Sequence, residues 1–375
     1  MSSGAAVHAD AQDDARWMAL ALSLGRRGMG RVWPNPAVGC VIVKDGRVLG
    51  RGWTQDGGRP HAETVALAQA GGAARGADVF VTLEPCAHTG KTPPCCDALI
   101  AAGVARVVVA ISDPDERVAG QGLARLRAAG IDVVTGVLAQ DATQDHAGFL
   151  LRIEQHRPFV TLKLAMSLDG RIATASGESQ WITGPEARRA VHAMRARHDA
   201  VMVGAGTARA DAPSLTVRGL GVARQPVRVV LSRTLDVPRS GPLFDTAQTV
   251  PVWLVHCREA PPEARKAWAD AGARLLEGAD GTVASALQAL AAQGLTRVFC
   301  EGGGAVAASL LEAGLVDELV VFHAGLVLGA GGVAGVAALP DGALGAAPRW
   351  SLQRTQQIGA DTLQVWRLSA RPNLT

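Results

Sequence analysis

Three short segments of this 375-residue chain carry the side chains of one metal site: His61-Ala62-Glu63, Pro85-Cys86 and Cys95. One His and two Cys are three of the four ligands that tetrahedral zinc takes, and the open position holds water. The metal lowers the pKa of that water, so hydroxide exists near neutral pH. We therefore predict His61, Cys86 and Cys95 as zinc ligands. Glu63 is predicted as the general base that takes the proton and passes it to a departing amine.

The residues around these ligands predict the local fold. Residues 61–72 have the pattern of a helix that ends at paired glycines, which places His61 and Glu63 in its first turn. Residues 78–84 read as a buried strand that delivers Cys86 at its end. Cys95 opens the next predicted helix, where the helix dipole and the metal both favour thiolate.

A fourth ligand would make the zinc structural, and the sequence offers His88 and Cys96 for it. Cys96 adjoins Cys95 on a helix and would point elsewhere, so we predict that it is not a ligand, whereas His88 stays open. Nucleic-acid deaminases space their two cysteines as CxxC. Here the spacing is CAHTGKTPPC, and its polar Lys91 and Thr92 suit a phosphate or a small polar ligand, or simply form a solvated turn.

Composition indicates a globular enzyme with more than one domain. The chain is 48% hydrophobic and 19% charged, and its net charge of +3 gives no reason to expect nucleic-acid binding. Six scattered cysteines fit a reducing cytoplasm better than a disulfide framework. We find no signal peptide and no apolar run of membrane-spanning length. We expect residues 1–12 to be disordered, with Asp13 or Asp14 capping a helix over residues 16–27.

Strand-like and helix-like patterns alternate along the whole chain, which indicates an α/β fold. Residues 13–156 are predicted as a first domain, in which a hairpin turning at Asp45-Gly46 follows the helix over residues 16–27 and leads into a layered fold with a mixed sheet. A second domain, 157–375, begins after His156-Arg157-Pro158. Its predicted strands and one helix lie at 159–170, 185–197 (the helix), 199–206, 227–231, 250–256 and 297–303. Residues 324–348 are rich in Gly and Ala and are predicted as loops or loose edges.

The second domain offers two weaker signals for a phosphate-bearing cofactor. Glycines follow predicted strands at 204–211 (GAGTARAD) and at 301–304 (EGGG), where backbone N–H groups at a helix start can approach phosphates. Taken singly, each cluster is more often a plain turn. The chain has no Tyr, which excludes a Tyr proton donor, and no GxGxxG with an acidic partner, which disfavours a standard Rossmann site.

Longer runs resemble the bifunctional riboflavin-biosynthesis family across nearly the whole chain and in its order: PNPAVGCVIVKDG, PHAE, TLEPCAHTGKTPPCCDALI, KLAMSLDGRIATASGESQWITG, GAGTARADAPSLTVR and CEGGG. The resemblance implies a cytidine-deaminase-like three-layer domain followed by a dihydrofolate-reductase-like domain. It implies Zn²⁺-dependent deamination of 2,5-diamino-6-(5-phosphoribosylamino)pyrimidin-4(3H)-one. It also implies NADPH-dependent reduction of the ribosyl group of 5-amino-6-(5-phosphoribosylamino)uracil to ribityl.

The resemblance also assigns residues in the second domain. Cofactor contacts would come from Ala165, Trp181, Thr207, Asp211, Gly303, Gly304, Ala305, Val306, Ala307, Ala308 and Ser309. Substrate contacts would come from Ser179, Arg195, Leu215, Arg218 and Glu301. Guanidinium groups suit a sugar phosphate, although Arg195 also fits the solvated face of a basic helix. The chain departs from the family pattern at Trp33, Ala87 and Asp115, where His, Ser and Asn are usual.

Three alternatives follow from the same residues. A nucleic-acid deaminase with an unrelated second domain would show salt-sensitive RNA binding. A non-enzymatic zinc-stabilised module would be inert and would unfold on chelation. A chain that has lost one of the two activities would keep both sets of motifs. A homo-oligomer is compatible with the sequence, which does not define the oligomeric state.

Overall fold

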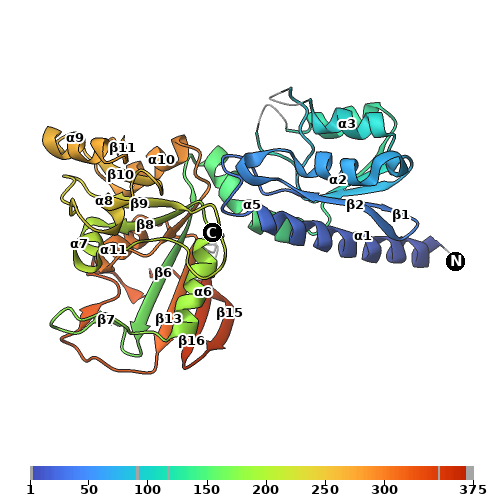
Figure 1. The fold of residues 1–375 in the computed structure, drawn as a ribbon. Helices are drawn as coiled ribbons and strands as arrows, with labels where there is room; N and C mark the ends of the chain where they lie inside the picture. The colour runs from blue at the N-terminus through green and yellow to red at the C-terminus, as the bar shows by residue number, and fades with distance from the viewer. Residues whose placement is uncertain (1–2, 90–92, 116–118, 345–346, 369–375) are drawn as a thin grey trace. The chain divides into compact units, whose positions relative to one another are not determined.

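The protein is described by a computed structural model that covers residues 3–89, 93–115, 119–344 and 347–368 (Figure 1). The chain folds as two compact units, Met1–Gln155 and His156–Thr375. The predicted boundary at residues 156 and 157 falls beside this division. Each unit is described by itself below.

Unit 1 is built on a five-stranded mixed sheet with the order β2-β1-β3-β4-β5. The hairpin β1–β2 and the pair β1–β3 are antiparallel, whereas β3, β4 and β5 are parallel. The elements are α1 (Ser3–Gly25), η1 (Arg26–Gly28), β1 (Gly39–Lys44), β2 (Arg47–Trp53), η2 (Asp56–Gly58), α2 (Ala62–Ala70), η3 (Gly71–Ala74), β3 (Asp78–Val81), α3 (Cys95–Ala102), β4 (Arg106–Val109), α4 (Gln121–Ala128), β5 (Asp132–Thr135) and α5 (Ala139–Glu154).

Alternating side chains of this sheet form two cores, which gives three layers. Cys40 and Ile42 face one core, together with residues of α2, α3 and α4. Val41 and Val43 face the other core, which α1 and α5 cover. Figure 1 shows α2 and α3 on one side of the sheet and α1 and α5 on the other. Because β1 is buried on both faces, it reads as a continuous apolar run rather than as an alternating one.

The first helix differs from the expectation. α1 begins at Ser3, inside the segment expected to be disordered and ahead of the predicted caps at Asp13 and Asp14. Alanines at this end of the helix favour its continuation. Asp14 lies within the helix, only 6% exposed. It accepts two hydrogen bonds from the Arg106 guanidinium, at 2.8 and 2.6 Å. Asp14 therefore fastens α1 to β4 and does not cap a helix.

A buried carboxylate holds the loop that follows β3. Glu84 is 4% exposed. Its oxygens accept from the backbone N–H groups of Asp113, Gly120, Gly122 and Leu123, at 3.3, 3.1, 3.0 and 3.3 Å. Charge-assisted bonds of this kind are among the stronger ones in proteins. They join the end of β3 to the start of α4 immediately before Pro85-Cys86.

Unit 2 contains a nine-stranded sheet with the order β11-β10-β9-β8-β12-β6-β13-β16-β15 and a small pair, β14-β7. The strands from β11 to β13 are parallel, and β16 and β15 add an antiparallel edge. The elements are β6 (Phe159–Ser167), β7 (Arg171–Ala173), α6 (Pro185–Arg195), β8 (Ala200–Gly204), α7 (Ala205–Asp211), β9 (Val227–Leu231), α8 (Pro242–Asp245), β10 (Val252–His256), α9 (Pro262–Asp270), β11 (Arg274–Glu277), α10 (Val283–Ala292), β12 (Arg297–Cys300), α11 (Gly304–Glu312), β13 (Glu318–Ala324), β14 (Val333–Ala334), β15 (Trp350–Ile358) and β16 (Asp361–Leu368).

The predicted strands of unit 2 are present, but they are only part of its sheet. The sequence analysis did not identify β11, β13, β15 or β16. β15 is exposed along most of its length, so it lacks the apolar signal by which a strand is recognised. Within residues 324–348, the described part is mostly loop, as predicted; Ala324 ends β13, and Val333–Ala334 form β14.

The start of unit 2 is anchored within that unit. The Arg157 guanidinium donates to both carboxylate oxygens of Asp317, at 2.7 and 2.8 Å. Asp317 also accepts from the backbone N–H of Val160 at 2.7 Å. Both side chains of the pair are about 15% exposed or less. These bonds tie the first residues of unit 2 to the start of β13.

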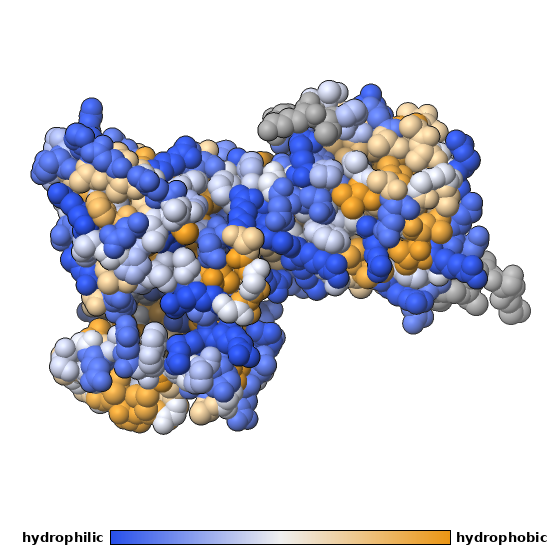
Figure 2. Space-filling view, viewed as in Figure 1, coloured by the Kyte–Doolittle hydropathy of each residue, from blue (hydrophilic) through white to orange (hydrophobic). Residues whose placement is uncertain are grey.

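The visible face of the protein is largely hydrophilic, with apolar side chains gathered in smaller groups (Figure 2). Within the described ranges, the helices include none that is both long enough and apolar enough to cross a membrane.

We predict that a fragment starting at Arg157 folds by itself, because Arg157 keeps its Asp317 partner in that fragment. Circular dichroism and thermal unfolding of residues 157–375 check this prediction. An aggregated or unfolded fragment beside a stable full chain would mean that the two units share one core.

We predict that Gly122→Ala lowers the zinc content of the chain. A Cβ at Gly122 would meet the Pro85 carbonyl oxygen at 2.1 Å, so the Pro85-Cys86 turn must shift. Gly72→Ala is the matched control, because a Cβ there meets nothing within 4 Å. Metal analysis of both purified variants measures the effect, and equal zinc content in the two would contradict this role for Gly122.

Candidate functional sites

The predicted zinc ligands converge from three separate elements of unit 1. His61 is the N-cap residue of α2 and makes no capping bond with its side chain. Cys86 lies in the turn after β3, and Cys95 is the first residue of α3. The backbone N–H of Cys95 donates to Cys86 Sγ at 3.3 Å, so the start of α3 also orients the first cysteine. The potential ligand atoms of all three residues lie within 4.8 Å of one another.

The spacing of these atoms fits zinc. His61 Nδ1 lies 3.3 Å from Cys95 Sγ and 3.7 Å from Cys86 Sγ. Zinc bonds of about 2.3 Å to sulfur and 2.0–2.1 Å to nitrogen imply N···S edges of ~3.5 Å in a tetrahedron. The three donors therefore fit three corners of a zinc tetrahedron, and a fourth position would remain for water.

The two thiols share one proton in this arrangement. The hydrogen bond from the Cys95 thiol lowers the pKa of Cys86 to about 4, and His61 adds to the effect. The same interaction raises the pKa of Cys95. Cys86 is thus a thiolate near neutral pH. A zinc ion held by both cysteines would also favour the thiolate form of Cys95.

Glu63 lies in the first turn of α2, 3% exposed, within hydrogen-bonding reach of the Cys95 thiol. Burial raises its pKa, and the neighbouring His61 opposes that shift. A buried carboxyl with a raised pKa is suited to general acid–base chemistry beside these ligands.

The other candidates near the zinc site stand apart from it. Among the described residues, the metal-binding group consists of His61, Cys86 and Cys95 and does not include His88. Cys96 packs in the core between the sheet and α2–α4, as expected for a non-ligand. Lys91 and Thr92 lie outside the described residues.

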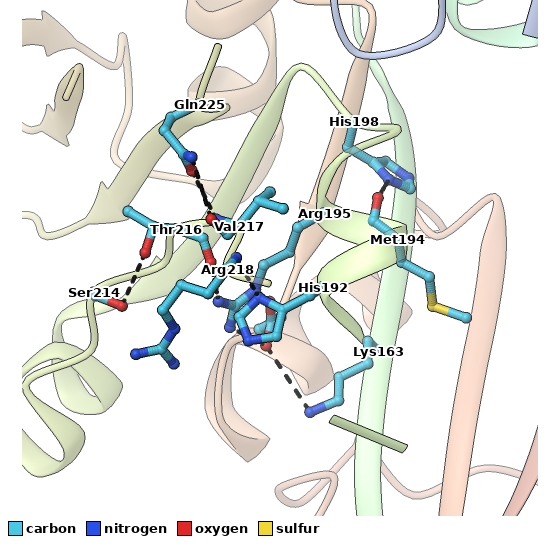
Figure 3. A network of polar contacts seen from close by, with 11 residues as sticks. Lys163, His192, Met194, Arg195, His198, Ser214, Thr216, Val217, Arg218 and Gln225 are labelled. Carbon is cyan, nitrogen blue, oxygen red and sulfur yellow. Dashed lines mark hydrogen bonds and ion pairs between the residues drawn. The ribbon is translucent and has the colours of Figure 1, made fainter. Parts of the chain in front are cut away.

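A second cluster of charged side chains lies in unit 2 (Figure 3). Arg195, at the end of α6, donates from Nε to Glu301 Oε1 at 2.5 Å and from Nη2 to Oε2 at 3.0 Å. Its Nη1 donates to the Thr216 carbonyl at 2.8 Å. Lys163, on β6, lies 4.0 Å from Glu301 Oε2. The Arg195 side chain is 12% exposed, so the interpretation of Arg195 as a solvated helix face is wrong.

Burial and charge set the ionisation of this cluster. Burial alone would raise the pKa of Glu301, but Arg195 and Lys163 outweigh it and hold that pKa below its ordinary value. Burial lowers the pKa of Lys163. Asp211 faces Lys163 and is hydrogen-bonded to Ser179, although burial raises its pKa. The predicted residues Ser179, Arg195, Asp211 and Glu301 thus meet around one lysine.

The two glycine clusters are adjacent in space. The Gly303 N–H donates to Thr207 Oγ1 at 3.0 Å, which joins the helix after β8 to the helix after β12. Gly303 is the N-cap of α11, so Gly304, Ala305 and Val306 form the first turn of that helix. Their N–H groups precede any intrahelical acceptor and can bind a phosphate. These residues fit the phosphates of a nicotinamide cofactor.

Several predicted contact residues are placed differently from the expectation. Residues 304–309 belong to α11 and are not a loop. Ala307 and Ala308 are buried, and Ser309 Oγ donates to the Ala305 carbonyl at 3.0 Å, so these three lie behind the phosphate-binding turn. Leu215 is 2% exposed and packs in the unit 2 core, which leaves only its backbone for a ligand.

Two further assigned residues, Trp181 and Ala165, differ in their surroundings. Trp181 is 65% exposed, and the Arg188 guanidinium lies 4.7 Å from the centre of its ring. That exposure is compatible with a stacking surface for a cofactor. Ala165 lies on β6, partly buried against the core.

Sequence reasoning missed Lys163 and His192. Lys163 was visible as one cation inside an apolar strand, a position that is costly unless the charge is used or paired. His192 precedes Arg195 by three residues and therefore shares its helix face.

Comparison with known proteins assigns a family to each of the two domains. Residues 11–111 match the cytidine and deoxycytidylate deaminase zinc-binding region, and residues 158–364 match the RibD C-terminal domain. The chain is 44% identical to riboflavin biosynthesis protein RibD of Escherichia coli, over 93% of this chain and 97% of that protein. It is 43% identical to RibD of Haemophilus influenzae, over 93% and 95%.

Solved structures extend the similarity to the whole fold. Acinetobacter baumannii RibD superposes with a TM-score of 0.88 at 39% identity, covering 96% of this chain and all of that one. A diaminohydroxyphosphoribosylaminopyrimidine deaminase/5-amino-6-(5-phosphoribosylamino)uracil reductase from Thermotoga maritima gives 0.85 at 34% identity, with the same coverage.

These similarities confirm the predicted pair of a cytidine-deaminase-like unit and a dihydrofolate-reductase-like unit. They also remove the alternatives of an unrelated second domain and of a non-enzymatic zinc module. The chain belongs to the RibD family of bifunctional deaminase–reductases of riboflavin biosynthesis.

Proposed function

We propose that the chain deaminates 2,5-diamino-6-(5-phosphoribosylamino)pyrimidin-4(3H)-one and then reduces the ribosyl group of 5-amino-6-(5-phosphoribosylamino)uracil to ribityl. The observation that carries the proposal is the pairing, in one chain, of the site of His61, Cys86 and Cys95 beside Glu63 with the cluster of Lys163, Arg195 and Glu301. The names of these substrates correspond to those of the Thermotoga relative.

Family membership brings two cofactors, Zn²⁺ and NADPH. Zinc supplies a Lewis acid that makes water nucleophilic near neutral pH. In the proposed deamination, Glu63 takes a proton from the attacking water and delivers it to the departing amine. Its burial beside the open corner of the site supports this role.

NADPH supplies the hydride of the reductase reaction. We assign the phosphates of NADPH to the first turn of α11 beside Thr207. Trp181 and Ala165 are assigned to contact the parts of the cofactor next to those phosphates. We propose that Lys163 gives a proton to the sugar oxygen; burial lowers the pKa of its ammonium group, which favours proton release. Glu301 and Asp211, which both face Lys163, orient it.

The two arginines have different proposed roles. Arg195 already donates to Glu301 and Thr216, so we propose that it holds Glu301 in place. Arg218 is exposed, and among the described residues no carboxylate forms an ion pair with its guanidinium. We therefore assign the substrate 5′-phosphate to Arg218.

The wider setting is part of the proposal. The substrates are small molecules, and we propose a cytoplasmic enzyme that binds no nucleic acid. We also propose a homo-oligomer, since the exposed strand β15 leaves a sheet edge open to pairing. Light scattering measures the oligomeric state. Salt-sensitive RNA binding would contradict the proposal that the enzyme binds no nucleic acid.

The test of the proposed function is one assay on zinc-replete protein. The enzyme should release ammonia from the diaminopyrimidine phosphate in the absence of NADPH. It should oxidise NADPH only after the substrate has been deaminated. Ammonia release without NADPH oxidation would identify a chain that has lost its reductase activity. Failure of both reactions would reject the proposed substrates.

We predict that Glu63→Gln keeps its zinc and loses ammonia release by ~10²–10⁴-fold, the usual contribution of a general base. Its reduction of added deaminated intermediate should equal that of the wild type. Wild-type ammonia release by this variant would remove Glu63 from the mechanism.

Cys86→Ser should lose zinc and ammonia release together, because it removes one of three ligands. Cys96→Ser is the matched control, since it changes a neighbouring buried thiol outside the metal group. Metal analysis and ammonia assays of both variants decide the assignment. If only Cys96→Ser lost zinc, Cys96 and not Cys86 would be the zinc ligand.

Arg218→Ala should raise the KM for the phosphorylated substrate roughly tenfold or more, since a charge-assisted hydrogen bond contributes about 1.5–3 kcal/mol. A dephosphorylated substrate should bind the variant and the wild type equally. Arg189→Ala, on the exposed side of α6, is the matched control. If the KM for NADPH rose instead, Arg218 would belong to the cofactor site, and the cofactor and substrate assignments would have to be exchanged.

A further inference from the structure

Gln225 lies next to the reductase cluster and has no role in the proposed chemistry so far. It is half-buried and precedes β9 by two positions. The residue before a proline is restricted to extended backbone, and Pro226 follows Gln225. Pro226 and the first residue of β9, Val227, are both buried. The main chain at Gln225 is therefore anchored to the sheet, and its side chain starts from a fixed point.

The Gln225 amide binds one residue of the neighbouring loop by both of its backbone groups. The Val217 N–H donates to Gln225 Oε1 at 2.7 Å, and Gln225 Nε2 donates to the Val217 carbonyl at 3.2 Å. The same Nε2 donates to the Val222 carbonyl at 3.3 Å. Figure 3 shows the Gln225 amide facing Val217, with Arg218 next in the chain. By donating and accepting in this way, the side chain satisfies the backbone as a neighbouring strand would.

The chain on either side of this contact needs such support. Leu215 has a φ of 54°, in the left-handed region that residues with side chains rarely adopt. On the other side, residues 218–221 are exposed, and Gly219 and Gly221 also have positive φ, of 71° and 63°. Exposed residues bury little surface. Hydrogen bonds to the backbone therefore define the point at which the Arg218 side chain leaves the fold.

We propose that Gln225 is a positioning residue of the reductase, which holds the backbone at Val217 so that the Arg218 guanidinium meets the substrate 5′-phosphate. The inference rests on the proposed function, because that function assigns the phosphate to Arg218. His192 supports the same segment, since the Arg218 N–H donates to its Nδ1 at 3.2 Å. An arginine loses conformational freedom when it binds a phosphate, and a fixed backbone reduces that loss. Gln225 thus contributes to substrate affinity without touching the substrate.

Gln225→Met tests this role, because methionine has a similar length and offers neither an N–H donor nor an amide oxygen. We expect the KM of the full-length chain for the phosphorylated uracil substrate to rise roughly tenfold. The kcat, the KM for NADPH and the KM for the dephosphorylated substrate should stay within about twofold, because the clamp acts only on phosphate binding. Gln288→Met, on the exposed side of α10, is the matched control.

A double variant separates positioning from direct binding. If Gln225 acts through Arg218, adding Gln225→Met to Arg218→Ala should change the KM for the phosphorylated substrate by less than about twofold. Independent contributions would multiply, and the double variant would then lose roughly a hundredfold.

Three results would overturn the inference: no change in Gln225→Met, an equal rise in KM for both substrates, or a multiplied loss in the double variant. Amide hydrogen exchange followed by NMR gives a check that needs no variant to fold. The Val217 amide should be protected in the wild type before substrate is added, and rapid exchange would contradict the proposal. A wild-type chain that reduces neither substrate would overturn the proposed function itself. That outcome is distinguishable, because the exchange result does not depend on turnover.

Discussion

A carboxylate buried at the end of a central strand organises each unit of this protein. Glu84 follows β3 and accepts four backbone N–H groups, which fixes the loop that presents Cys86. Glu301 follows β12 and is held by Arg195 and Lys163. A buried charge is costly unless hydrogen-bond donors or opposite charges surround it. Each carboxylate therefore holds the donors and cations around it in a defined arrangement. The reactive groups of each unit are positioned around that arrangement.

Both sites also use the carboxyl ends of parallel strands. The turn after β3 carries Cys86, whereas Thr207 follows β8 and Glu301 follows β12. Helices that start at these ends add the positive end of their dipoles. In unit 1 that position holds Cys95, the first residue of α3. In unit 2 the start of α11 faces the phosphate region proposed for NADPH. The carboxyl ends of parallel strands therefore carry residues of both the deaminase site and the reductase site.

The sequence predicted the zinc ligands and much of the fold because each signal was local. His61, Cys86 and Cys95 are each placed by the end of one element, and helix starts and buried strands can be recognised from short patterns. Predicting the zinc site required no information on distant contacts, apart from the assumption that the ends of these helices and strands lie close together. The family resemblance added the reductase assignments, which glycine clusters alone did not support.

What the sequence did not reveal depends on side-chain direction and on partners far along the chain. Lys163 and Glu301 meet across neighbouring strands, and His192 is fixed by the backbone of Arg218. Leu215 matched the family motif, yet its side chain belongs to the core. Asp14 looked like a helix cap because its partner, Arg106, lies 92 positions away.

We propose that three protein ligands hold the catalytic zinc and leave its fourth position open. X-ray absorption spectroscopy of the zinc-loaded protein measures the number and kind of these ligands. We expect two sulfur ligands at about 2.3 Å and two nitrogen or oxygen ligands at about 2.0–2.1 Å, one of them an imidazole. A third sulfur, from Cys96, or a second imidazole, from His88, would close the site and contradict an open fourth position.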